Sequence, residues 1–92
     1  MSQFYEGSAS WNMGAIADGN EATTDITVTG AALGDFVQVS SSADVADLTL
    51  VGAVTAANTV TVQLGNWTGA SIDHGTVTIY VMVTKRLAMV DA

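Results

Sequence analysis

The chain has no cysteine and no proline among its 92 residues, and it carries few basic side chains. The absence of cysteine excludes disulfides and thiolate chemistry, and it leaves the redox compartment open. Only Lys85 and Arg86 stand against nine acidic residues, which gives a formal net charge of −7. This balance argues against a nucleic-acid partner, because phosphate binding needs clustered Lys and Arg. The simplest role of the charge is to maintain solubility.

Long apolar runs are also missing. The N-terminal sequence MSQFYEGSAS has neither a basic region nor an apolar core, so we predict no signal peptide. The most apolar stretch, Val77–Val83, is strand-sized and far below the roughly 20 residues of a membrane span. We therefore expect no membrane association.

The residues that are present suit one small domain with a thin core. Hydrophobic residues make up 49% of the chain, and most of them are alanine and valine. Aromatic residues are scarce, with two each of Trp, Tyr and Phe. We expect a flat core, or one that neighbouring subunits complete.

Apolar and polar residues alternate with a period of two, which is typical of half-buried β-strands. In Asp25–Thr29, Ile26 and Val28 alternate with threonines. We predict strands over Ala9–Ile16, Ala22–Thr29, Phe36–Ser41, Leu48–Val54, Thr59–Leu64 and Thr76–Thr84. Their spacing of about 8–12 residues predicts an all-β fold, a small antiparallel β-sandwich or jelly-roll-like barrel of about six to eight short strands.

Two features of this pattern predict local contacts. Gly52, inside a predicted strand, indicates a bulge or the close approach of another backbone. In the last strand Val77, Ile79, Val81 and Val83 share one face, and Thr76, Thr78, Tyr80, Met82 and Thr84 share the other. Tyr80 and Met82 make this second face partly apolar, so a second sheet or another subunit is expected to cover it.

Two terminal segments flank the predicted sandwich of residues 9–86. We interpret residues 1–8 as an N-terminal arm, in which Phe4 and Tyr5 either pack on their own domain or reach a partner. Residues 87–92 form a C-terminal tail. Its apolar Leu87 and Met89 have nothing obvious to pack against, so we expect the tail to dock on its own domain or on a neighbour.

No combination of side chains predicts catalysis. His74 is the only imidazole, and no nucleophile with an adjacent base can be assigned. Asp44 and Asp47 would need a cleft to work as an acid pair, and a chain this small offers little room. The acidic loop Ala17–Glu21 has oxygen ligands that suit Ca²⁺ but lacks the spacing of a calcium loop. We expect no enzyme, no cofactor and no metal.

The loop Gly65–Gly75 holds the sequence Asn66-Trp67-Thr68, which matches a glycosylation sequon. Without a secretion signal we interpret the match as chance. Trp67 either plugs the end of the core or anchors a partner, and we favour the plug.

The order of short motifs along the chain resembles a family of small phage virion proteins. The resemblance runs from about Trp11 to Thr84 and rests on ATTDITVT (Ala22–Thr29), GAALGDF (Gly30–Phe36), LTLVG (Leu48–Gly52), ANTVTV (Ala57–Val62), NWTG (Asn66–Gly69) and DHGTV (Asp73–Val77). Similar modules occur as stand-alone head-decoration (cement) proteins and within phage tail or head fibres. The short chain, starting at Met1 without a coiled-coil or collagen-like stem, leads us to expect a stand-alone protein.

The resemblance implies a non-enzymatic virion protein on the outer capsid surface, bound to the major capsid protein, commonly as a homotrimer that clamps adjacent capsomers. The expected capsid contacts are Phe4, Tyr5 and Trp67. The expected subunit interface is formed by Tyr80, Met82, Leu87 and Met89. The alternative is a fibre or spike module that binds a host surface glycan through Trp11 or Trp67.

Overall fold

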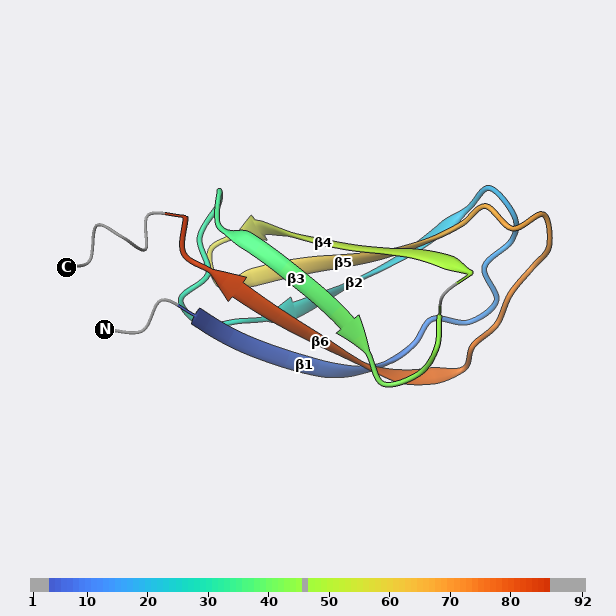
Figure 1. Cartoon of the computed structure of the whole chain (residues 1–92), viewed down its shortest axis with the longest axis horizontal. Helices are drawn as coiled ribbons and strands as arrows, with labels where there is room; N and C mark the ends of the chain where they lie inside the picture. The colour runs from blue at the N-terminus through green and yellow to red at the C-terminus, as the bar shows by residue number, and fades with distance from the viewer. Residues whose placement is uncertain (1–3, 46, 87–92) are drawn as a thin grey trace.

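The computed structural model describes residues 4–45 and 47–86, which form six β-strands and no helix. The strands are β1 (Phe4–Asn12), β2 (Glu21–Thr27), β3 (Phe36–Ser41), β4 (Leu48–Ala56), β5 (Thr59–Asn66) and β6 (Thr76–Thr84). They make two three-stranded antiparallel sheets, β1-β6-β3 and β2-β5-β4, packed as a sandwich (Figure 1). The predicted all-β sandwich is confirmed.

The two central strands, β5 and β6, come from the C-terminal half of the chain, and strands from earlier in the sequence flank each of them. Every connection except the β4–β5 hairpin passes from one sheet to the other (Figure 1). Residues far apart in the sequence are therefore placed side by side. The sheet β1-β6-β3 is assembled from three separate segments, and the sheet β2-β5-β4 from β2 and the β4–β5 hairpin.

The core lies between the two central strands, as their alternation predicts. Val60, Val62 and Leu64 of β5 are completely buried. The opposing face of β6 buries its inward residues Val77, Ile79, Val81 and Val83. A fully buried Val, Leu or Ile contributes about 1.5–3 kcal/mol, so this double row supplies much of the stability of so small a domain.

Two glycines allow the sheets to approach each other closely at both sides of the sandwich. A Cβ atom on Gly52 of β4 would lie 2.5 Å from Cγ2 of Val39 in β3. A Cβ on Gly7 of β1 would lie 2.8 Å from Cγ2 of Val28, just beyond β2. Gly52 thus marks a close approach, made by a side chain of the opposite sheet rather than by a backbone. The register shift in β4 lies further along, between Val54 and Ala56.

The prediction for the first strand was wrong at both ends. β1 begins at Phe4 rather than at Ala9, so it includes most of the expected N-terminal arm. It pairs with β6 from its first residue, where Phe4 lies opposite Thr84. The inward positions include Gly7 and Ala9, and these small residues hid the alternation in the sequence.

The C-terminal prediction is only partly within the described residues. β6 has the predicted bounds, Thr76–Thr84. Leu87 and Met89, expected in a subunit interface, lie outside the described residues.

Candidate functional site

The outer face of the sheet β1-β6-β3 carries a group of exposed aromatic side chains, and we name it the aromatic face. Directly opposed residues of antiparallel strands point to the same side of a sheet. The register therefore gives three rows across this face: Phe4–Thr84–Phe36, Glu6–Met82–Gln38 and Ser8–Tyr80–Ser40. Phe4, Phe36 and Tyr80 are 57%, 62% and 48% exposed. Exposed aromatic rings gathered on one sheet face are typical of a binding surface.

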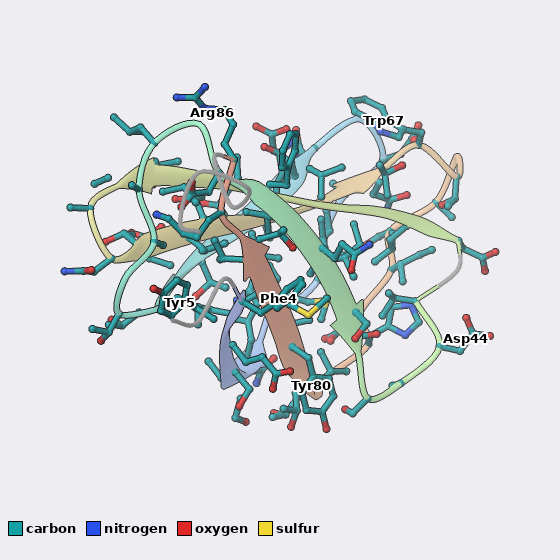
Figure 2. The ribbon with its side chains drawn as sticks, turned by 60° about the vertical axis from the view of Figure 1, so that its left-hand side comes forward. Phe4, Tyr5, Asp44, Trp67, Tyr80 and Arg86 are labelled. Carbon is teal, nitrogen blue, oxygen red and sulfur yellow. The ribbon has the colours of Figure 1, made fainter. Side chains whose placement is uncertain are left out.

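The second and third rows of the aromatic face line a shallow, open hollow, and the row that holds Phe4 and Phe36 lies outside it. Its rim and floor include Glu6, Gln38, Tyr80 and Met82. Figure 2 shows Phe4 and Tyr80 placed along β6. The face thus combines apolar rings with polar groups at its edges, and it is open enough for a partner's side chains to enter.

The opposite outer face, on the sheet β2-β5-β4, has a different character. The Thr61 hydroxyl donates to Oδ1 of Asp25 at 2.7 Å and lies 2.8 Å from the hydroxyl of Thr55. Nε2 of Gln63 donates to Oε2 of Glu21 at 2.6 Å. Polar side chains on this face therefore bond to one another, as expected of a surface that stays in water.

The structure brings together Phe4, Tyr80 and Met82, which the sequence assigned to two different contacts. It separates Phe4 from Tyr5, because neighbours in a strand point to opposite sides. The ring of Tyr5 packs against the core and against Gly30, where a Cβ atom would lie 2.8 Å from Cε1 of the ring. Tyr5 therefore packs on its own domain, which is the first of the two alternatives stated for it.

Phe36 is the member of the aromatic face that the sequence analysis missed. The alternation of residues in β3 could have indicated that Phe36 faces outward. If Val37 and Val39 face the core, as they do, Phe36 must point outward.

Trp67 lies at the end of the sandwich remote from Phe4, in the loop that follows β5 (Figure 2). Its side chain is 65% exposed, so it does not cover the end of the core. The indole lies against Gly65, where a Cβ atom would be 3.0 Å from Nε1. The favoured plug interpretation was wrong, and contact with a partner remains a prediction for Trp67.

Asn66 organises this end of the molecule, a role that the sequence did not reveal. Its side chain is completely buried, and Nδ2 donates to the carbonyls of Ile16 and Ala70, each at 2.7 Å. Oδ1 accepts from the backbone N–H of Thr68 at 3.0 Å and from its hydroxyl at 2.8 Å. These bonds hold the loop after β5 against the β1–β2 connection. The buried amide is also inaccessible to glycosylation in the folded chain.

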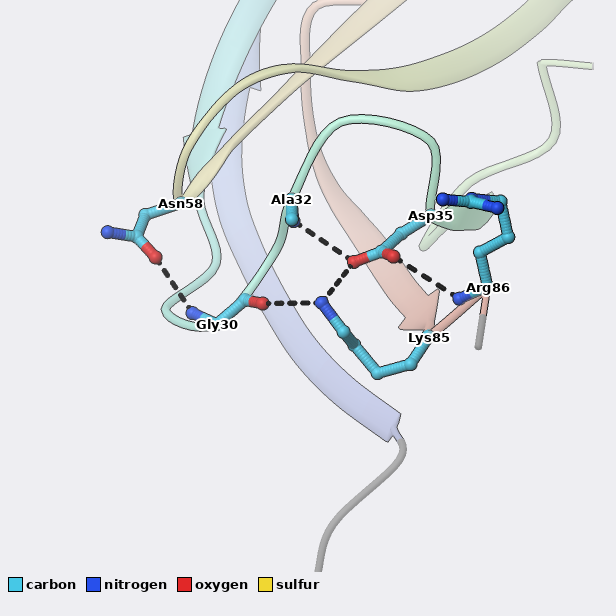
Figure 3. A network of polar contacts seen from close by, with 6 residues as sticks. All are labelled: Gly30, Ala32, Asp35, Asn58, Lys85 and Arg86. Atoms are coloured by element: carbon cyan, nitrogen blue, oxygen red, sulfur yellow. Dashed lines mark hydrogen bonds and ion pairs between the residues drawn. The ribbon is translucent and has the colours of Figure 1, made fainter. Parts of the chain in front are cut away.

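Asp35 ties the β2–β3 connection to the end of β6 (Figure 3). Its Oδ2 accepts from Nζ of Lys85 at 2.7 Å and from the N–H of Ala32 at 3.0 Å, and Oδ1 accepts from the N–H of Arg86 at 3.2 Å. The side chain is 5% exposed. Desolvation raises the pKa of this carboxyl, but the hydrogen bonds and the charge of Lys85 outweigh it and hold the pKa below its ordinary value.

This lowered pKa predicts a pH-dependent contribution to stability. A carboxyl with a depressed pKa stabilises the fold above its ordinary value of 3.8, and that contribution is lost as the pH falls through the folded-state pKa. We expect Asp35→Asn to cost about 2 kcal/mol at pH 7, from the loss of hydrogen bonds to a charged group. The cost should become smaller as the pH falls below 3.8 and through the folded-state pKa.

Urea unfolding of both proteins at pH 7, 4 and 2.5 measures this difference. Glu6→Gln is the matched control, because it removes an exposed carboxylate that makes no hydrogen bond to another described residue. A cost of Asp35→Asn that is the same at pH 2.5 and pH 7 would contradict the assignment.

The other side chains considered for metal binding or catalysis do not come together in one site. Oδ1 of Asp18 accepts from the N–H of Gly69 at 3.0 Å, and Glu21 bonds to Gln63. Nε2 of His74 is buried without a hydrogen-bond partner among the described residues. Within residues 4–45 and 47–86, no three His, Asp or Glu side chains are grouped closely enough to hold a metal ion. That same part of the chain contains no helix that could cross a membrane.

Comparison with known proteins gives no match, whether to a family model, to a curated protein or to a solved structure. The functional argument therefore depends on the surfaces described above and on the motif order of the sequence. The aromatic face is the strongest of these surfaces.

Proposed function

We propose that this chain is a non-enzymatic capsid decoration protein that binds the outer surface of a phage major capsid protein lattice and stabilises the head. The observation that carries the proposal is the contrast between the two outer faces of the sandwich. One face presents Phe4, Phe36 and Tyr80 to the outside. The other carries polar side chains bonded to one another, and Val51 is the one large hydrophobic residue exposed on it among the described residues. A one-sided surface of this kind suits a protein that lies against another protein. The order of motifs supports a virion location.

The size of the aromatic face favours several copies acting together. The three strands of the aromatic face lie about 4.8 Å apart and contribute about six residues each, so the face measures roughly 14 by 20 Å, or about 300 Å². A stable interface buries about 800 Å² on each partner, so one face alone binds weakly. A homotrimer in which each copy holds a different capsomer would bind tightly through its high effective concentration. Binding to the assembled lattice then stabilises that lattice by mass action.

The residues of the aromatic face fit two contacts within this proposal. Phe4 and Phe36, at the end of the sheet, would contact the capsid protein. Tyr80 and Met82, further along β6, would contact a neighbouring copy. The acidic character of the chain suits the outside of the shell rather than its DNA-facing interior.

Replacement of one exposed ring tests which face docks. We expect Phe36→Ser to weaken binding to undecorated heads by at least about tenfold, because burying much of a Phe side chain contributes about 1.5 kcal/mol or more per copy. Val51→Ser is the matched control, because Val51 is 48% exposed on the opposite sheet. Co-sedimentation with heads over a range of protein concentrations measures both variants. Equal affinities of the two variants would show that the aromatic face is not the docking surface.

The second candidate function is a fibre or spike module that binds a host surface glycan. The exposure of Trp67 favours it, because an open indole can stack on a sugar ring. Trp11, the other tryptophan considered, packs against the core. A glycan array with the purified chain tests this candidate, and specific binding that Trp67→Ser abolishes would support it over head decoration.

A further inference from the structure

The charges of the described residues are segregated along the length of the sandwich. Both basic residues, Lys85 and Arg86, follow directly on the end of β6. The opposite end, formed by the loops after β1 and β5 and the start of β2 and β4, carries five carboxylates and no described cation: Asp18, Glu21, Asp44, Asp47 and Asp73. Figure 2 shows Arg86 and Asp44 at opposite sides of the molecule. We name these two regions the basic end and the acidic end.

The basic end also carries much of the exposed apolar surface. Phe4 and Phe36 flank Thr84 in the last row of the aromatic face, and Leu33 lies in the β2–β3 connection at the same end of the sandwich. These are three of the six large hydrophobic residues that are exposed among the described residues. Apolar surface and positive charge are therefore concentrated at the same end of the molecule.

Arg86 supplies the free positive charge at this end. Lys85 is neutralised by its 2.7 Å ion pair with Asp35. Only the backbone N–H of Arg86 bonds to Asp35, and its guanidinium has no ion-pair partner among the described residues. The side chain lies along Gly34, where a Cβ atom would be 3.0 Å from Nε. Among the described residues of the β2–β3 connection and the end of β6, two cations less Asp35 leave a net charge of +1. Glu6 lies one row further along the aromatic face, and the acidic end carries −5.

We propose that the protein docks end-on, with the basic end turned to its partner and the acidic end turned away. The partner is a protein surface that presents carboxylates beside an apolar patch, complementary to Arg86 and to the rings of Phe4 and Phe36. This inference rests on the proposed function and adds the orientation of the chain and the chemistry of the surface that receives it. A single free guanidinium is too little for nucleic acid, which needs several phosphate contacts.

The length of the sandwich, compared with the range of electrostatic interactions in salt, explains why a chain of net charge −7 can bind an acidic surface in this orientation. The two ends are separated by the length of a nine-residue strand, about 30 Å at 3.3 Å per residue. The Debye length at physiological ionic strength is about 8 Å. The carboxylates of the acidic end are therefore screened from a partner at the basic end, whereas Arg86 is in contact range. In the reverse orientation, five carboxylates would face the acidic surface directly.

Two substitutions that change the net charge equally test the orientation. Arg86→Gln and Asn20→Asp each lower the charge by one, the first at the basic end and the second at the acidic end. Both keep the backbone groups that form hydrogen bonds at these positions. We expect Arg86→Gln to weaken binding of the trimer to undecorated heads by about tenfold at low salt and to reduce its salt dependence. Asn20→Asp should bind like the unaltered chain.

The same co-sedimentation series separates failure of the orientation from failure of the function. If the unaltered chain binds heads and both variants bind equally well or equally weakly, the end-on orientation is wrong and the decoration function stands. If the folded, unaltered chain does not bind heads, the proposed function fails and the orientation fails with it. Arg86→Lys should retain most of the binding, which would confirm that the charge at this position matters.

Discussion

Replacing Asn66 with alanine is expected to lower the free energy of unfolding by about 3 kcal/mol, because each buried polar group left unpaired costs about 1–3 kcal/mol. The substitution removes two donors that meet the carbonyls of Ile16 and Ala70. It also removes the acceptor of both bonds from Thr68. Water can replace the hydrogen bonds to Ala70 and Thr68, which are partly exposed. Most of the free-energy cost therefore comes from the buried bond to Ile16. A domain of this size has a total stability of only about 5–14 kcal/mol.

Urea unfolding followed by tryptophan fluorescence measures the effect, and a second variant separates hydrogen bonding from volume. Asn66→Asp keeps the size and one acceptor but loses both donors, and it places a carboxylate against two carbonyls. It should be at least as destabilising as Asn66→Ala. Asn20→Ala is the matched control, with an exposed side chain that makes no hydrogen bond to another described residue. An Asn66→Asp variant as stable as the unaltered protein would refute the role assigned to Asn66.

Gly52→Val is expected to lower the free energy of unfolding by about 3 kcal/mol, at the upper end of the range for overpacked sites. The new Cβ would lie 2.5 Å from Cγ2 of Val39 and 3.3 Å from Cγ1 of Val37. Both neighbours are β-branched and stiff at χ1, so they cannot move aside without shifting β3. Valine has a higher strand propensity than glycine, but that gain is at most about 1 kcal/mol. The steric cost therefore prevails.

The neighbouring residue provides the control for this prediction. Ala53 points outward from the same strand, so Ala53→Val gains strand propensity without the clash and should leave stability unchanged or slightly raised. Val39→Ala combined with Gly52→Val should recover part of the lost stability, because it removes the atom that the new side chain meets. A Gly52→Val variant with unchanged stability would contradict the close approach of the two sheets.

The sequence predicted several strands well from the alternation of apolar and polar residues. β3 and β6 have their predicted bounds, and the inward faces of β5 and β6 are the predicted ones. β2 runs over Glu21–Thr27 rather than the predicted Ala22–Thr29. β1 was misplaced because Gly7 and Ala9 hold inward positions without producing a visible apolar pattern. β4 and β5 extend beyond the prediction, to Ala56 and Asn66, because their pairing with each other continues there.

The candidate site could not be predicted because it depends on strand order. Phe4 and Phe36 lie on the same row only because β6 passes between β1 and β3. The same holds for the pairing of Asp35 with Lys85, which joins a loop to the end of a strand far along the chain. Local alternation shows which side of a strand a residue faces, but it does not show which strands are neighbours.

Co-sedimentation of the purified chain with undecorated heads of its phage, together with its native mass by light scattering, tests the central claim most directly. We predict saturable binding of a trimer at a fixed ratio to the major capsid protein. A stable, folded protein that remains in the supernatant at every concentration would contradict head decoration and make host surface glycans the next ligands to test.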